Sequence, residues 1–185
     1  MKEFAYLYPI PEYTDFICRP EWAIKRRYKK VLNQAVDIRY RQQGFAINYV
    51  IFDGHQVSDA IDLRPTDRII EAGIDFKTHR SRLPNGEHPY PNPDYVLDQL
   101  TGLRILRVAG FHLWDCVEKL AQRAYERGVD TLVDEDLTEL LPGAMIRKDF
   151  RVDAYPTFNP RELGPALLEF FMDARRDRPW LWQDY

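Results

Sequence analysis

Cysteine and long apolar runs are the features that this sequence has least of. Its 185 residues include only two cysteines, Cys18 and Cys116, so a disulfide framework is excluded and a reducing compartment is favoured. No stretch approaches the ~20 apolar residues that a membrane-spanning helix needs. The first residues also lack the apolar core and the cleavage site of a signal peptide. We therefore expect a cytoplasmic protein without a membrane partner.

An excess of positive charge is also missing. The 26 lysines and arginines nearly balance the 29 aspartates and glutamates, which argues against a nucleic-acid partner. The basic run KRRYKK at residues 25–30 is expected to be the solvated face of a long helix. Among the nine glycines there is no glycine-rich phosphate loop, which argues against flavodoxin-like nucleotide binding. The length and the 45% hydrophobic content fit one globular domain over residues 1–185.

Hydrophobic patterning predicts alternating strands and helices, the order typical of an α/β fold with a mainly parallel sheet. The proline-rich stretch 83–93 is expected to be a loop over a site, and the aromatic tail after residue 177 is expected to dock on this subunit or on a partner. The pattern predicts strands at 4–10, 45–52, 74–77, 103–108, 129–133 and 146–152, and helices at 20–43, 66–72, 113–127, 137–141 and 160–176.

Cys116 is the strongest candidate for a reactive residue. It follows the strand at 103–108 and falls in the first turn of the helix at 113–127. Ligands bind beyond the carboxyl ends of parallel strands, and the N–H groups and dipole of a helix N-terminus favour a thiolate. The other interpretation is a small buried hydrophobic residue on an apolar helix face, a common fate of a free cysteine.

Several residues around Cys116 stand at a spacing that favours the first interpretation. They are Gly110, the pair Cys116-Val117, Ala121, Ala124, the pair Arg127-Gly128, and Glu135-Asp136. This segment resembles the nucleophile segment of the isochorismatase-like cysteine hydrolases, which include nicotinamidases and N-carbamoylsarcosine amidohydrolases. KTHRS at 77–81 is similar to the segment that holds the lysine of that family, and AYLYPIPEYTDF at 5–16 is similar to its first strand. Nothing beyond about residue 140 shares the resemblance.

The resemblance implies a three-layer αβα sandwich around a six-stranded sheet, and a triad of Asp, Lys and Cys without an organic cofactor. Cys116 would be the nucleophile that attacks an amide or related carbonyl, and Lys77 the cation that stabilises its anionic partners. The position of the aspartate, counted back from Phe16, holds Pro11. Glu12 is the neighbouring carboxylate and the tentative replacement. Because a positioned acid or base commonly contributes ~100-fold to 10,000-fold in rate, this departure weakens the amidase assignment.

The resemblance also implies an oxyanion hole that uses the Cys116 N–H, beside a non-proline cis peptide at Phe111-His112. We expect Phe111, His112 and Trp114 to contact the substrate, and their bulk indicates an altered or obstructed pocket. The pair Asp53 and His55 at the end of a strand is similar to part of a zinc site, but a metal site needs a third ligand. The other histidines do not fall where that site would need them, so no metal is expected.

Two functions follow from the sequence. The first is a cysteine hydrolase that acts on a small-molecule amide or similar C–N bond through a Cys116 thioester. The second is a catalytically impaired member of the same fold that serves as a ligand-binding or protein-interaction subunit. Pro11 favours the second, whereas the presence of Cys116 and Lys77 favours the first. A homo-oligomer is expected by resemblance in either case.

Overall fold

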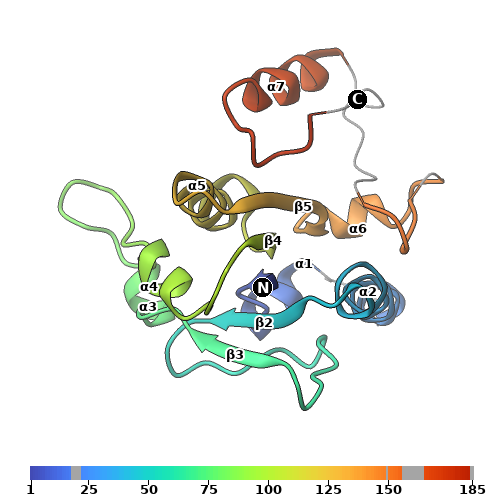
Figure 1. The fold of residues 1–185 in the computed structure, drawn as a ribbon, viewed down its shortest axis with the longest axis horizontal. Helices are drawn as coiled ribbons and strands as arrows, with labels where there is room; N and C mark the ends of the chain where they lie inside the picture. Colours follow the sequence, from blue (N-terminus) through green and yellow to red (C-terminus); the bar gives the residue numbers. More distant parts are fainter. Residues whose placement is uncertain (18–21, 149, 156–164, 184–185) are drawn as a thin grey trace.

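The computed structural model describes residues 1–17, 22–148, 150–155 and 165–183. It has an α/β fold in which five parallel strands form one sheet in the order β3-β2-β1-β4-β5, with helices on both faces (Figure 1). The α/β class predicted from the sequence is therefore confirmed. The strands are β1 (Lys2–Leu7), β2 (Ala46–Ile51), β3 (Arg68–Glu71), β4 (Ile105–Gly110) and β5 (Asp130–Thr138).

Of the three inner strands, β1 and β2 are buried on both faces, because helices cover both sides of the sheet. Side chains alternate along a strand, so Phe4 and Tyr6 of β1 enter one apolar layer, whereas Ala5 and Leu7 enter the other. This two-sided burial explains why the strands are nearly continuous apolar runs in the sequence.

The first layer lies under α4 (Pro93–Asp98) and α5 (Glu118–Glu126). Leu120, Ala121 and Ala124 give α5 its apolar stripe, and all three are buried against the sheet. The helix ends before Gly128, whose φ of 76° lies in the left-handed region. These features confirm the apolar face predicted for the helix at 113–127.

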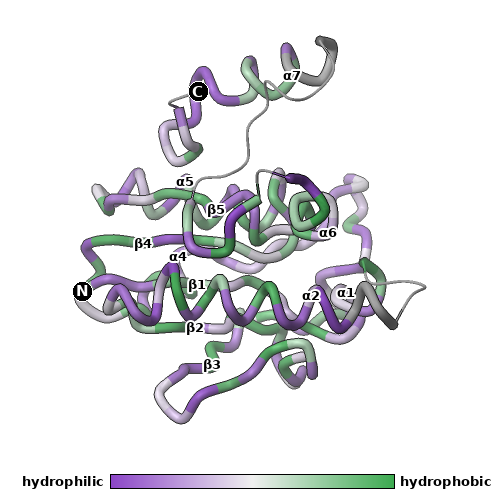
Figure 2. Tube along the Cα trace, turned by 90° about the vertical axis from the view of Figure 1, so that its right-hand side faces the viewer, coloured by the Kyte–Doolittle hydropathy of each residue, from purple (hydrophilic) through white to green (hydrophobic). Residues whose placement is uncertain are grey.

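The second layer lies under α2 (Trp22–Ala35), which alternates hydrophobic and hydrophilic residues along its length (Figure 2). It continues through a π-helical turn, η1 (Val36–Tyr40), and a 3-10 turn, η2 (Arg41–Gln43). Gly44 then ends it with a φ of 79°. The long helix predicted at 20–43 is thus confirmed from residue 22 onward, and its first residues lie outside the described part of the chain.

Two neighbouring predictions between residues 66 and 77 are wrong. Residues 68–71, expected in a helix, form the edge strand β3, because Ile70 packs into the core while the strand pairs with β2. The expected strand at 74–77 gives way to the short helix α3 (Phe76–His79). Asp75 begins this helix, since its side chain accepts a hydrogen bond from the Thr78 backbone N–H at 2.9 Å.

The sequence also predicted a sixth strand at 146–152 and a helix at 137–141. The described residues of 146–152 form no strand, so the sheet has five strands. Strand β5 runs on through Thr138, and the short helix α6 (Leu141–Ala144) begins only after it. The sequence missed this extension because β5 bulges around three buried acidic residues, Asp134 to Asp136, which interrupt the apolar pattern.

Arginines from elsewhere in the chain neutralise these buried acids. The Arg39 guanidinium donates to the carboxylates of Asp134 and Asp136, each at 3.0 Å. On the other side of the strand, Arg175 pairs with Glu135. Each pair joins segments that are far apart in the sequence. The bulge therefore ties η1 and the C-terminal region to the outer strand of the sheet.

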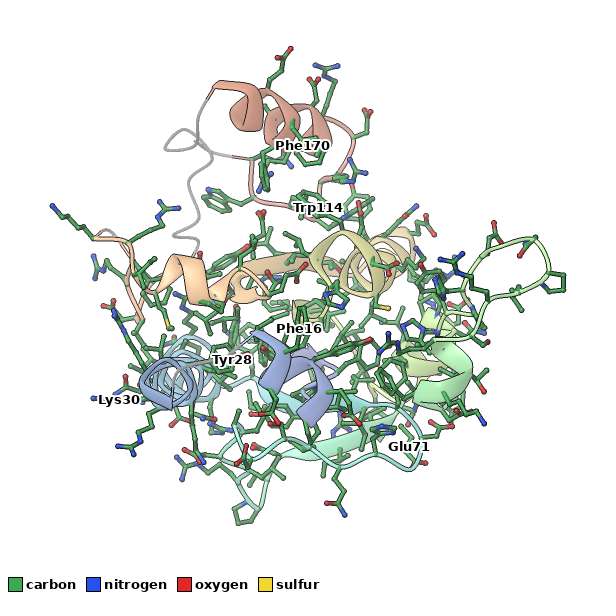
Figure 3. The ribbon with its side chains drawn as sticks, turned by 180° about the vertical axis from the view of Figure 1, so that it is seen from behind. Phe16, Tyr28, Lys30, Glu71, Trp114 and Phe170 are labelled. Atoms are coloured by element: carbon green, nitrogen blue, oxygen red, sulfur yellow. The ribbon has the colours of Figure 1, made fainter. Side chains whose placement is uncertain are left out.

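The C-terminal helix α7 (Pro165–Arg175) lies beyond β5 (Figure 1). Trp114 packs against Phe171 of this helix, with ring centroids 5.6 Å apart, and it faces α7 in Figure 3. The Val133 N–H donates to the Trp180 carbonyl at 2.8 Å, and both Trp180 and Leu181 are buried. The predicted docking of the aromatic tail is thus confirmed on this subunit. Of the C-terminal helix expected at 160–176, residues 160–164 lie outside the described part of the chain, and α7 covers residues 165–175.

The short remaining helix α1 (Pro11–Ile17) lies directly after the loop that follows β1. None of the helices in the described part of the chain is long and apolar enough to cross a membrane.

Candidate functional site

The candidate site lies at the carboxyl ends of β1 and β4, where Leu7 pairs with Gly110. Gly110 has a φ of 110°, and a Cβ at this position would lie 2.2 Å from the Leu7 carbonyl oxygen. Only glycine fits this close approach of two strands. The chain then turns through the Phe111-His112 peptide, which is cis as the sequence analysis expected.

The turn η3 (Leu113–Val117) carries Cys116 but is not a regular first helical turn. Trp114 and Asp115 leave the helical φ/ψ region, and the Val117 N–H donates to the His112 carbonyl at 3.1 Å. The Leu113 N–H donates to the Glu139 carboxylate at 2.9 Å, which fixes the start of the turn. Cys116 therefore precedes the regular helix α5, a correction to the placement that the sequence predicted.

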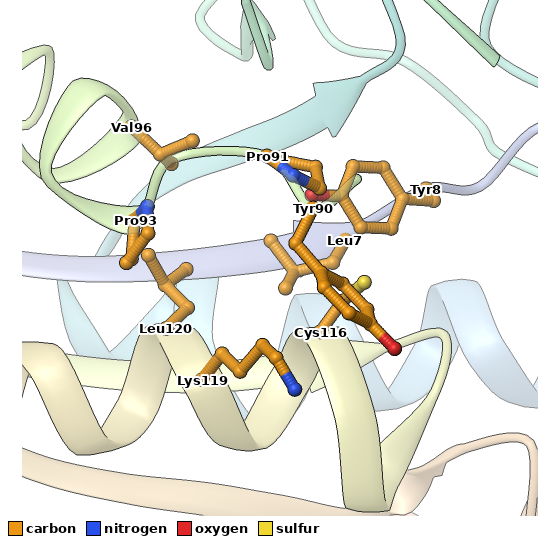
Figure 4. A pocket seen from close by; sticks show the side chains of 9 residues that line it. All are labelled: Leu7, Tyr8, Tyr90, Pro91, Pro93, Val96, Cys116, Lys119 and Leu120. Atoms are coloured by element: carbon orange, nitrogen blue, oxygen red, sulfur yellow. The ribbon is translucent and has the colours of Figure 1, made fainter. Parts of the chain in front are cut away.

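The Cys116 thiol is enclosed. Only 6% of the residue is exposed, and its sulfur borders a space of about 10 Å³ (Figure 4). Burial raises the pKa of the thiol to about 12; the Asp115 carboxylate adds to this shift, and the Lys119 ammonium opposes it. The walls of this inner space are formed by Leu7, Tyr8, Tyr90, Pro91, Pro93, Val96, Cys116, Lys119 and Leu120.

The cation beside the thiol differs from the one that the sequence predicted. Lys77 lies on the exposed helix α3 rather than on a strand, and it does not line the inner space. Lys119 lines it instead, from the first turn of α5, and its ammonium is 3.1 Å from the Asp115 carboxylate. The sequence could have indicated Lys119, because it stands three residues after Cys116, a spacing that places two side chains side by side on a helix.

The replacement carboxylate also lies elsewhere. Glu12 is an exposed residue of α1 that faces His55, with 3.5 Å between its carboxylate and the imidazole Nε2. It does not line the inner space.

The residue that directly follows β1 and faces the thiol is Tyr8, whose φ is 55°. Desolvation raises the pKa of Tyr8 well above its ordinary value, so a protonated phenol occupies this position. The sequence predicted this strand over residues 4–10, but β1 ends at Leu7, three residues earlier.

A larger cleft opens beside the inner space and has a volume of about 640 Å³. Its acidic residues have partners, since Glu12 faces His55 and Asp115 binds Lys119. Arg80 and Arg82 also line it, and within the described residues neither guanidinium has a carboxylate within 4.0 Å. The walls of this outer cleft are formed by Glu12, Tyr13, Phe16, Phe76, His79, Arg80, Arg82, His88, Tyr90, His112 and Asp115.

The three residues expected to contact substrate are separated in the structure. His112 lines the outer cleft. Phe111 is fully buried in the second apolar layer, where its ring lies 5.4 Å from that of Tyr13. Trp114 packs against α7 and lines neither space. Only His112 of this group is therefore placed to touch a ligand in the cleft.

Asp53 and His55 both follow β2, but their side chains make separate contacts. The Asp53 carboxylate accepts a hydrogen bond at 2.8 Å from the N–H of Gly73, which follows β3, whereas His55 faces Glu12. In the described part of the chain, no group of three or more His, Cys, Asp or Glu side chains is arranged to hold a metal ion.

Comparison with known proteins adds no assignment to this geometry. No family model matches the chain, and no curated protein or solved structure matches it.

Proposed function

We propose that the protein is a ligand-binding member of the α/β class in which cysteine catalysis is impaired. The observation that carries this proposal is the enclosure of the Cys116 sulfur in a space whose walls contain no carboxylate. An acyl transfer to sulfur needs a thiolate and a group that accepts the thiol proton. The described site supplies neither at neutral pH.

The energetics favour the neutral thiol. With a pKa of about 12, the fraction of thiolate at pH 7 is on the order of one in 100,000. Besides Cys116, the walls of the inner space hold the phenols of Tyr8 and Tyr90 and the ammonium of Lys119, and desolvation raises the pKa of both phenols. A protonated phenol can donate a hydrogen bond but cannot take the proton of the thiol.

The outer cleft has the features of a small-molecule site. Its volume of about 640 Å³ falls within the usual range for ligands, and it lies at the carboxyl ends of parallel strands. Phe76 and Tyr90 provide aromatic surface, while Arg80 and Arg82 provide donors that favour a planar anion. We therefore propose an aromatic or similarly planar carboxylate as the ligand.

Alkylation of the thiol separates this function from the hydrolase. In a Cys18→Ser variant, which leaves one thiol, we expect iodoacetamide to modify Cys116 at least about 30-fold more slowly than free cysteine at pH 8. The rate should still rise with pH beyond 10, because burial raises the thiol pKa to about 12. Mass spectrometry measures the modification, and the same protein in urea is the control. Rapid alkylation below pH 8.5 would establish an activated nucleophile and favour the hydrolase.

The outer cleft predicts selectivity for charge. Benzoate should shift the NMR signals of the Arg80, Arg82 and Tyr90 amides, and its neutral isostere benzamide should bind at least about 10-fold more weakly, because a hydrogen bond to a charged group is worth ~1.5–3 kcal/mol. Arg80→Gln or Arg82→Gln should reduce the affinity for benzoate and leave the affinity for benzamide unchanged. Arg104→Gln removes the same charge from an exposed residue outside the cleft and is the matched control. Equal binding of both probes would contradict the anion site.

A further inference from the structure

Tyr90 forms part of the wall of both the inner space and the outer cleft. In Figure 4 its ring lies next to the Cys116 sulfur. The residue belongs to the loop that precedes α4, and 37% of it is exposed. One partly exposed side chain thus separates the enclosed thiol from the open cleft.

The Tyr90 ring contacts the ring of the buried His79, with centroids 5.7 Å apart, and polar groups nearer the surface. The Lys119 ammonium is 4.1 Å from the centroid of the Tyr90 ring. Desolvation, followed by a hydrogen bond with Asp115, raises the pKa of the Tyr90 hydroxyl to about 12. The Lys119 ammonium and the Asp115 carboxylate also bind each other directly, at 3.1 Å. A rotation of the Tyr90 side chain therefore leaves this ion pair intact.

The walls behind Tyr90 are mostly apolar. Leu7, Val96 and Leu120 come from the first apolar layer. The inner space of about 10 Å³ has room for about one water molecule, so no ligand group enters it while Tyr90 stays in place. With the ring turned away, an apolar surface at the sulfur becomes continuous with the cleft that contains Arg80 and Arg82.

We propose that the inner space and the outer cleft are two parts of one ligand site, and that Tyr90 is the movable wall between them. This inference rests on the proposed ligand-binding function and specifies its ligand further. The outer part takes a carboxylate, and the inner part takes an apolar group after Tyr90 rotates. The ligand class is thus an anion with an apolar end, and its binding exposes the thiol to the ligand.

Three variants in the Cys18→Ser background test the wall. Tyr90→Ala should increase the alkylation rate of Cys116 by iodoacetamide at pH 8 at least 10-fold, because the sulfur is no longer covered. Tyr90→Phe keeps the ring and should stay within about 3-fold of the parent. Tyr95→Ala removes an exposed tyrosine that lines neither space, and it should leave the rate unchanged.

The ligand is tested with two carboxylates, benzoate and the longer 3-phenylpropionate, by calorimetry. Tyr90→Ala should bind 3-phenylpropionate at least about 10-fold more tightly than the parent does, because the wall need not be displaced, whereas benzoate should gain no affinity. Bound 3-phenylpropionate should also protect Cys116 of this variant from alkylation.

The outcomes distinguish the two proposals. A slow parent thiol together with an equally slow Tyr90→Ala thiol overturns the movable wall and leaves the binding function in place. Acceleration of the same size in Tyr95→Ala also overturns it, because the effect would then be general loosening. A parent thiol that reacts rapidly below pH 8.5 overturns the proposed function itself.

Discussion

Replacing Arg39 with methionine is expected to lower the free energy of unfolding by about 3–5 kcal/mol, because it leaves two carboxylates buried without their cation. Arg39 and Asp134 have side chains that are 2% and 0% exposed, and the guanidinium also binds Asp136 at 3.0 Å. The same side chain donates to the backbone carbonyl of Val152 at 2.9 Å. The substitution therefore releases the chain after α6 as well as the bulge of β5.

The loss of unfolding free energy in the Arg39 variant should be larger at neutral pH than at low pH. Burial raises the pKa of Asp134 to about 6, and the Arg39 guanidinium acts against this shift. Without Arg39 the folded-state pKa rises further above the unfolded value of about 3.9. A raised folded-state pKa gives stability that is present at low pH and is lost as the pH rises through that pKa. The deficit of the variant is therefore largest at neutral pH and decreases towards pH 4.

Urea unfolding of the parent and the variant at several pH values measures this deficit. Arg151→Met is the control, since Arg151 pairs with Asp153 where the two side chains are 66% and 53% exposed. This exposed pair should contribute less than about 1 kcal/mol. Similar losses in the two arginine variants, or a deficit that grows on acidification, would contradict the role of Arg39 as the buried counterion.

Gly110→Ala is the second change with a large expected effect. The added methyl group would lie 2.2 Å from the Leu7 carbonyl oxygen and 2.5 Å from the Leu7 nitrogen. These are backbone atoms of the central strand, which cannot rotate away as a side chain can. Overpacking and the φ of 110° each cost about 1–3 kcal/mol, so we expect a loss of about 2–6 kcal/mol. Urea or thermal unfolding measures it.

Gly128→Ala is the matched control for this change. Gly128 has a similarly left-handed φ of 76°, but nothing lies within 4 Å of the position that its Cβ would take. Its substitution should cost only about 1–2 kcal/mol from backbone conformation. Where the Gly110 variant folds at all, its Cys116 should alkylate faster than that of the parent, because β1 and β4 must separate beside the thiol. Equal losses at the two glycines would show that the strands do not crowd Gly110.

Much of the fold could be predicted from local patterns. The apolar runs of β1, β2 and β4 and the apolar stripe of α5 are strong signals, because each element buries one regular set of positions. The predictions failed at β3, α3 and the end of β5. There a short edge strand with an exposed Ile69, a helix begun by the Asp75 cap, and a run of acids within a strand do not follow the expected periodicity.

The candidate site was predictable only in part. The sequence placed Cys116 and the cis peptide correctly at the carboxyl end of β4. It assigned the cation to Lys77 and the acid to Glu12 because it relied on spacing within separate segments. The structure brings Lys119 and Tyr8 to the sulfur instead, since the end of β1 and the orientation of α5 are set by packing against the sheet.

The sequence by itself located four of the five strands, β1, β2, β4 and β5, and the position of Cys116 after β4, because hydrophobic periodicity and glycine turns act over a few neighbouring residues. Only the tertiary structure decided whether the thiol is open or enclosed. That property depends on Leu7, Tyr90 and Leu120, which belong to three segments that no local pattern connects. Burial among them desolvates the sulfur, and this desolvation raises the pKa of the Cys116 thiol to about 12.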